Sequence, residues 1–298
     1  MTMTLKGLSA FPITPCSPDG RVDAGSMRRL LAPLLAAEVD SIGLLGSTGS
    51  YPYVTREERR RALDLALDEA SGRVPILVGV GALRTDEAIR LAQDAKAAGA
   101  EAGLLAAVSY TPLNEEEVFQ HFVAVARGSG LPLCIYDNPG TTHFTFTPAL
   151  IGRLGHVPGV IAVKSPAPAA AVVSAHLNTL RDVVPDGFEL GYSVDWHAAE
   201  ALLAGGDAWY SVAGGVFPNV CLRLVRAAQS GDADETRRID GTLQPLWALF
   251  KEFSSLRVVY AALATLDICH AEPPRPILPL PEAAQRRVAE VVKQLNLS

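Results

Sequence analysis

The stretch from residue 133 to residue 164, LCIYDNPGTTHFTFTPALIGRLGHVPGVIAVK, contains two short apolar runs separated by a helical pattern. The runs are Leu133–Tyr136 and Val160–Lys164, and neither alternates with polar residues. Strands that are buried on both faces of a parallel sheet have this composition. Thr147 and Pro148 mark the expected start of the intervening helix, where the missing N–H of proline is tolerated. The stretch therefore predicts one β-α-β unit of a parallel sheet.

The same unit recurs along most of the chain. Eight apolar runs are expected strands: Leu8–Ile13, Ser41–Leu45, Ile76–Val80, Ala102–Ala107, Leu133–Tyr136, Val160–Lys164, Phe188–Gly191 and Ala208–Val212. Eight β-then-α units in about 220 residues predict an α/β protein with a closed (β/α)8 TIM barrel. An open, doubly wound sheet is the alternative. It is disfavoured because no glycine-rich phosphate-binding turn follows the first run.

The alternation of strand and helix patterns ends after Asn219. Only helical patterns follow, over Val220–Gln229, Ala233–Phe253, Leu256–Leu266 and Glu282–Leu295. We therefore expect a barrel domain over residues 1–222 and a C-terminal helical extension over residues 223–298. Gly99 and Gly128 lie where earlier helices are expected to end, since glycine readily takes the left-handed conformation that follows a helix.

The composition excludes several classes of function. Of the 298 residues, 49% are hydrophobic and 19% are charged, which is below the roughly 25% charged residues of an average domain. Basic residues are outnumbered 26 to 32 by acidic ones, which argues against a nucleic-acid partner. The longest uncharged stretch, residues 165–180, is shorter than the roughly 20 residues that span a bilayer. We therefore expect no membrane partner.

The cysteines also bear on the environment of the protein. The four cysteines are far apart and form no CxxC pair, so we expect reduced thiols, no metal site and a cytoplasmic location.

Polar residues stand at the ends of the expected strands, where barrel enzymes carry their chemistry. They are Ser47, Thr48 and Gly49 after the second strand, Tyr110 after the fourth, and Tyr136, Lys164 and Ser211 at the ends of the fifth, sixth and eighth. Burial can lower the pKa of a lysine from about 10.4 by about 3–5 units. A lysine so activated attacks a ketone to give a Schiff base. A lysine that only reaches from a strand end to water is the alternative for Lys164.

Together these residues resemble the pyruvate-dependent class I aldolase family of dihydrodipicolinate synthase and N-acetylneuraminate lyase. The resemblance rests on Ala10–Pro15, on Gly46–Gly49 in place of the family's GxTGE loop, on Tyr136–Gly140 in place of its Y-N-x-P-G turn, and on Val163–Lys164 in its Schiff-base strand. It implies a lyase in which Lys164 forms an imine with pyruvate or another 2-oxo acid. Tyr136 is then the general acid and base, and no cofactor is needed because the protonated imine is the electron sink.

The resemblance also implies the surroundings of that imine. Ser47 and Thr48, in the loop with Gly49, bind the carboxylate of the 2-oxo acid, and Ser211 lines the same pocket. Ser47 links Tyr136 to Tyr110 in a proton relay. Because that second tyrosine enters from an adjacent subunit in relatives, we expect a homo-oligomer, typically a homotetramer built as a dimer of dimers.

One departure from the family pattern leaves the second substrate open. In dihydrodipicolinate synthase an arginine follows the Y-N-x-P-G turn and binds the carboxylate of the second substrate, but this chain has Thr141 there. An aldolase that joins a 2-oxo acid to an aldehyde or cleaves the product is the main expectation. The alternatives are a sugar-acid dehydratase or hydratase-aldolase using the same lysine, a Schiff-base barrel for phosphorylated sugars, and a catalytically silent 2-oxo acid-binding barrel.

Overall fold

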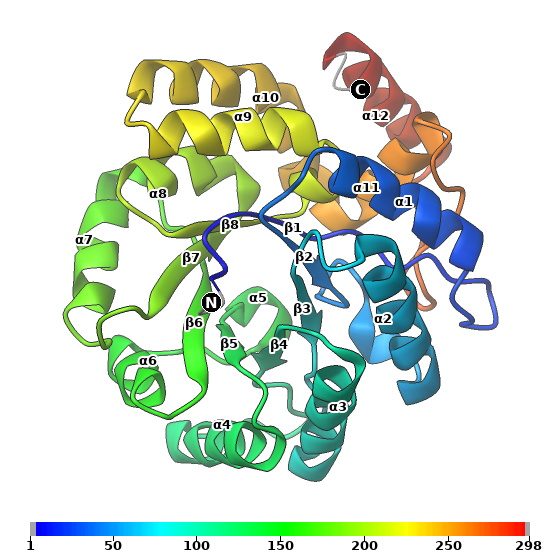
Figure 1. Cartoon of the computed structure of the whole chain (residues 1–298). Coiled ribbons are helices and arrows are strands. Elements are labelled where there is room, and N and C mark those ends of the chain that lie inside the picture. The colour runs from blue at the N-terminus through cyan, green and yellow to red at the C-terminus, as the bar shows by residue number, and fades with distance from the viewer. Residues whose placement is uncertain (1–3, 296–298) are drawn as a thin grey trace.

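A computed structural model describes residues 4–295, and its strands close into one barrel (Figure 1). All neighbouring strands run parallel, in chain order from the first to the eighth. They are β1 (Gly7–Ala10), β2 (Ser41–Leu44), β3 (Ile76–Gly79), β4 (Ala102–Ala106), β5 (Leu133–Tyr136), β6 (Val160–Pro166), β7 (Glu189–Ser193) and β8 (Ala208–Ser211). The predicted (β/α)8 TIM barrel is confirmed, and the strand ends differ from the expected ones by up to three residues.

Helices surround the barrel on the outside (Figure 1). They are α1 (Ala24–Ala36), α2 (Arg56–Ala70), α3 (Thr85–Ala98), α4 (Glu115–Ser129), α6 (Pro148–Gly155), α7 (Ala170–Arg181), α8 (Ala198–Leu203) and α9 (Pro218–Gln229). The short helix α5 (Pro139–Thr142) lies inside this ring, at the carboxyl end of β5 (Figure 1). Three short 3₁₀ turns lie in the connections, η1 (Tyr51–Tyr53), η2 (Asp195–His197) and η3 (Ala213–Gly215). No helix within residues 4–295 is long and apolar enough to cross a membrane.

The helical C-terminal region consists of α10 (Ala233–Phe253), α11 (Ser255–Thr265) and α12 (Glu282–Leu295). Helix α10 packs against α8 and α9, and α11 packs against α10 and α12. Leu243 and Trp247 of α10 are fully buried in the same apolar core as the barrel helices. The division expected between residues 222 and 223 falls inside α9, and a separation into two domains stays a prediction.

Local sequence explains the start of α2 and the end of α3, but the end of α4 differs from the expected one. Thr55 accepts a hydrogen bond from the backbone N–H of Glu58 at the start of α2, and Gly99 ends α3 with a positive φ of 106°. Gly128 was expected to end the next helix, and this prediction is wrong, because α4 continues to Ser129 and Gly130 follows it with a positive φ of 61°. A Cβ at Gly128 would lie 3.0 Å from the Ile89 side chain. Gly128 therefore serves the close packing of α3 and α4.

The inside of the barrel holds a second, smaller apolar cluster that includes Phe11, Leu104, Tyr136 and Tyr210. At the amino ends of the strands, the Leu5 backbone N–H donates to the Glu189 carboxylate at 2.7 Å and Leu5 fills the barrel floor. The described N-terminus lies over the centre of the barrel (Figure 1). Because this end is closed, the opposite end, at the carboxyl ends of the strands, is the one open to a ligand.

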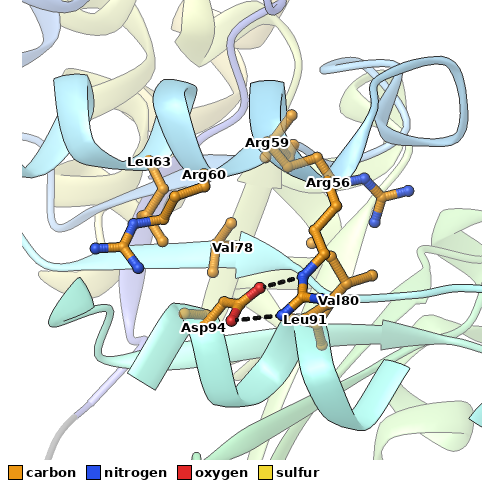
Figure 2. A pocket seen from close by; sticks show the side chains of 11 residues that line it. Arg56, Arg59, Arg60, Leu63, Val78, Val80, Leu91 and Asp94 are labelled. Carbon is orange, nitrogen blue, oxygen red and sulfur yellow. Dashed lines mark hydrogen bonds and ion pairs between the residues drawn. The ribbon is translucent and has the colours of Figure 1, made fainter. Parts of the chain in front are cut away.

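Figure 2 shows a small pocket between α2 and α3, with Arg56 and Asp94 at its edge. Arg56 donates to both carboxylate oxygens of Asp94, at 2.6 and 2.9 Å. The pocket has a volume of about 20 Å³, which suits a single water molecule. It is therefore a feature of helix packing and has no room for a substrate.

Candidate active site

A cavity of about 480 Å³ lies at the carboxyl ends of the strands. Five of the residues expected to form the site line it: Ser47, Thr48, Tyr136, Thr141 and Lys164. A volume of this size suits a small organic substrate. The cavity therefore brings together residues from the loop after β2, from β5 with its following turn, and from β6.

Lys164 lies in β6 directly opposite Tyr136 in β5, and both side chains point into the barrel. Its side chain is almost fully buried, with 3% exposed. Burial lowers the pKa of Lys164 to about 7, while the nearby Cys134 thiol and Asp195 carboxylate act in the opposite direction. Because a protonated amine cannot attack a carbonyl, a pKa near neutrality gives the lysine a substantial nucleophilic fraction at pH 7.

Three aromatic rings surround the lysine nitrogen. The Nζ atom lies 3.5 Å from the ring centre of Phe11, 5.3 Å from that of Tyr136 and 5.8 Å from that of Tyr210. Two glycines make room for these rings, since a Cβ at Gly43 would lie 2.2 Å from Phe11 and one at Gly191 would lie 2.2 Å from Tyr210. Sequence reasoning missed the position of Phe11, because a phenylalanine in an apolar run looks like any core residue.

Tyr136 makes two hydrogen bonds through its hydroxyl. Its Oη donates to Ser47 Oγ at 2.9 Å, and Asn138 Nδ2 donates to Tyr136 Oη at 2.9 Å. Ser47 follows a turn in which Leu45, just after β2, has a positive φ of 53°. Asn138 was not expected to be in the site, and its place in the Tyr136–Gly140 turn was its only sequence signal.

The other expected site residues lie elsewhere in this chain. Tyr110 is 96% exposed and has no contact with Ser47 or Tyr136 within the described chain. Gly49 packs on the backbone of Leu45, and Ser211 Oγ is fully buried and accepts from the backbone N–H of Gly214 at 2.8 Å. Gly49 and Ser211 are not among the described residues that line the cavity.

Asp195 is a buried acidic residue of the cavity that the sequence reasoning did not single out. Its carboxylate accepts from Trp209 Nε1 at 2.9 Å and from the Ala213 backbone N–H at 2.8 Å. Burial raises the pKa of Asp195, and these hydrogen bonds act against that rise. Asp195 therefore holds the loop after β8 against the end of β7, close to Lys164.

The charges of the cavity are few. Among the described lining residues, Lys164 is the only basic side chain and Asp195 the only acidic one, and hydroxyl and amide groups supply most of the remaining polarity. Within residues 4–295, no three His, Cys, Asp or Glu side chains form a group that could hold a metal ion. Polar recognition in the described cavity thus depends mainly on uncharged groups around one lysine.

The sequence profile of the dihydrodipicolinate synthetase family matches residues 4–295, almost the whole chain. The chain belongs to the dihydrodipicolinate synthetase family. It is 36% identical over 249 residues to the 4-hydroxy-tetrahydrodipicolinate synthase of Methylococcus capsulatus, covering 83% of this chain and 84% of that protein. The crystal structure of dihydrodipicolinate synthase from Agrobacterium tumefaciens is 56% identical, with a TM-score of 0.96 and 98% of each chain covered.

A further member of the dihydrodipicolinate synthetase family is similar in structure. A protein described as the first monomeric dihydrodipicolinate synthase variant is 26% identical and has a TM-score of 0.90, with 98% of this chain and 97% of that chain covered. The expected family is thereby confirmed, and with it a lyase of the pyruvate-dependent class I aldolase type that acts on small molecules.

Proposed function

We propose that this chain binds a 2-oxo acid as an imine on Lys164 and then makes or breaks a carbon–carbon or carbon–oxygen bond beside it. The observation that carries this proposal is the buried Lys164 amine, with a pKa of about 7, directly opposite Tyr136. Lys164 Nζ attacks the ketone carbon, the carbinolamine loses water, and an iminium remains. Loss of a proton from the neighbouring carbon then gives an enamine, which attacks an aldehyde.

Tyr136 moves the protons in this sequence. It protonates the departing hydroxyl of the carbinolamine, and it exchanges protons with the oxygen of the second substrate. Its hydrogen bond with Ser47 supports this role, because Ser47 gives the proton a route toward the opening of the cavity.

Ser47 and Thr48 bind the carboxylate of the 2-oxo acid, and the loop that contains Gly49 supports them. Ser211, the last residue of β8, supports the site through the loop that follows, because its Oγ accepts a hydrogen bond from the backbone N–H of Gly214.

The second substrate is recognised by uncharged groups. Thr141 lines the cavity at the position where the family pattern has an arginine, and no arginine is among the described lining residues. Losing a guanidinium removes a bidentate partner for a carboxylate. Hydroxylated partners, as in a sugar-acid dehydratase or a hydratase-aldolase, therefore fit this cavity better than an acidic semialdehyde does.

By this proposal, the enzyme assembles as a homo-oligomer. Tyr110 of one subunit then reaches Ser47 of the neighbouring subunit. Two observations support it. The Tyr110 side chain is 96% exposed in the single chain, and large aromatic side chains left in water often belong to an interface. In addition, Ser47 Oγ still has a proton to donate beyond its bond with Tyr136.

The imine is tested by trapping. The protein is incubated with pyruvate and sodium borohydride, and its peptides are then examined by mass spectrometry. We expect a pyruvate-derived adduct on Lys164 in the wild-type protein and none in Lys164→Met. The exposed Lys6 and Lys251 serve as internal controls for non-specific reductive labelling. An unmodified Lys164, under conditions that label another member of the family, contradicts the proposal.

The second substrate is tested with a panel of aldehydes and sugar acids, for the wild-type protein and for Thr141→Arg. We expect hydroxylated substrates to react best with the wild-type protein. The added guanidinium of Thr141→Arg should improve kcat/KM toward aspartate semialdehyde, and Thr141→Gln, a longer polar side chain without charge, is the control. Wild-type activity confined to aspartate semialdehyde refutes the assignment.

A further inference from the structure

Asn138 occupies a position where its side chain has two competing uses. It is the residue that precedes helix α5, and asparagine there usually caps the helix by accepting a hydrogen bond from the backbone. The Asn138 side chain makes no such bond. Its Nδ2 instead donates to Tyr136 Oη at 2.9 Å. The amide nitrogen is thus directed toward the cavity and Tyr136.

The backbone of Asn138 compensates for the missing cap. Its carbonyl oxygen accepts from the backbone N–H groups of Thr141 and Thr142, both at 2.9 Å, and from Thr142 Oγ1 at 3.1 Å. Asn138 Oδ1 lies on the side of the turn, 3.4 Å from where a Cβ of Gly140 would be. With the carbonyl held and the amide oxygen turned toward Gly140, the amide nitrogen faces Tyr136.

This contact gives the hydrogen bonds around Tyr136 a direction. An amide nitrogen can only donate, so Tyr136 Oη accepts from Asn138 and its own proton points to Ser47 Oγ. Ser47 accepts that proton, and its own hydroxyl is left to donate into the cavity. The donor from Asn138 also stabilises the phenolate that forms whenever Tyr136 gives up its proton, because hydrogen bonds to charged groups are the strong ones.

We propose that Asn138 is a positioning residue for the reaction: it fixes the direction of proton transfer from Tyr136 through Ser47 and stabilises the phenolate. This inference rests on the proposed role of Tyr136 as the proton-transfer group. It assigns to Asn138 a function that acts within one chain, independently of whether Tyr110 arrives from a neighbour. It concerns the rate of proton transfer and leaves the binding of the 2-oxo acid to other residues.

The test follows the exchange of the methyl protons of pyruvate for deuterium in D₂O, measured by NMR, which requires the imine and proton transfer but no second substrate. We expect Asn138→Leu to lower kcat for exchange about 10- to 100-fold, the effect of losing one hydrogen bond to an ionised group. The KM for pyruvate should remain near the wild-type value. Asn178→Leu makes the same change on the exposed side of α7 and serves as the matched control.

A double-mutant cycle separates this role from a purely structural one. The variant Tyr136→Phe has no phenol oxygen that could accept a hydrogen bond from the Asn138 amide. Adding Asn138→Leu to it should therefore cause no further loss of exchange. An equal loss in the Tyr136→Phe background, or wild-type exchange in Asn138→Leu, overturns the proposal.

A second variant guards against misfolding. Asn138→Asp keeps the size of the side chain but, when ionised, accepts from Tyr136 and diverts its proton from Ser47. It should lose exchange about as much as Asn138→Leu, and full activity in this variant also overturns the proposal. Borohydride labelling of Lys164 should still go to completion in both variants. If the wild-type protein itself is not labelled, the proposed imine fails, which is a different result from loss of the Asn138 effect.

Discussion

The Nζ atom of Lys164 lies 3.5 Å from the centre of the Phe11 ring, and that ring occupies the space left by Gly43. These three residues come from β6, from the loop after β1 and from β2. A cation over an aromatic face gains electrostatic attraction, whereas the surrounding burial favours the neutral amine. Burial lowers the pKa of Lys164 to about 7, against the opposing effects of the Cys134 thiol and the Asp195 carboxyl group.

Gly43→Ala is therefore expected to disturb both stability and catalysis. A Cβ at residue 43 would lie 2.2 Å from Phe11, so the ring must move toward Lys164 or the strand must shift. Overpacking of this kind destabilises by about 1–3 kcal/mol, measurable by urea unfolding. The rate of pyruvate trapping on Lys164 should fall as well. Gly241→Ala is the control, because nothing lies within 4 Å of its new Cβ on α10 and the change should stabilise the helix by up to about 1 kcal/mol.

The pH dependence of imine formation should follow the lysine. Because only the neutral amine attacks, the rate of trapping with sodium cyanoborohydride should rise as pH passes through about 7 and then level off. A rate that first rises near pH 10, where an ordinary lysine titrates, would contradict the assigned pKa. Ethylamine added to a reaction without protein provides the ordinary-amine control.

The lowered pKa of Lys164 should also make the free energy of unfolding depend on pH. Between pH 7 and 10.5 the unfolded chain carries more protons on this lysine than the folded one does, since its pKa falls from 10.5 to about 7 on folding. The contribution of Lys164 to the free energy of unfolding therefore increases with pH across this window. Lys164→Met should lack that slope in urea unfolding measured from pH 6.5 to 10. Parallel curves for the two proteins contradict the prediction.

Asp137 is expected to be a destabilising residue at neutral pH. Burial raises the pKa of its carboxyl to about 6, and its Oδ1 atom is buried without a hydrogen-bond partner among the described residues. Between pH 3.8 and 6 the folded chain holds more protons on Asp137 than the unfolded one, so its contribution to stability falls as pH rises. Asp137→Asn should raise the melting temperature at pH 7 and weaken this dependence. A lower melting temperature at pH 7 counts against it, and the exposed Asp234→Asn is the control.

The proposed contribution of Tyr110 across subunits can be measured by mixing inactive variants. The Tyr110→Phe variant retains Lys164, and the Lys164→Met variant retains Tyr110. If Tyr110 acts on a neighbouring subunit, oligomers that contain both chains have some sites with an intact set of residues. Activity after dissociation and reassembly of the mixture should then exceed the sum of the two parents. No gain, in mixed oligomers verified by mass, shows that Tyr110 does not act across subunits.

The sequence by itself determined the barrel and the identity of its central residues. Alternation of apolar runs with amphipathic ones is a local pattern, and a run such as Val160–Lys164 carries it regardless of what surrounds it. The strand ends meet at one face of a barrel, so Lys164, Tyr136 and Ser47 could be placed near one another in advance. The hydrogen bond of 2.9 Å from Tyr136 Oη to Ser47 Oγ agrees with that expectation.

Only the tertiary structure decided the environment of these groups. Phe11, Tyr210 and Asp195 reach Lys164 from β-strands and loops far away in the sequence, and the burial that sets its pKa is a property of all of them together. The use of the Asn138 side chain was likewise not readable, because the same asparagine could have capped its helix. Local sequence sets periodicity and turn chemistry, whereas pKa values and hydrogen-bond partners depend on contacts that form only when distant segments pack.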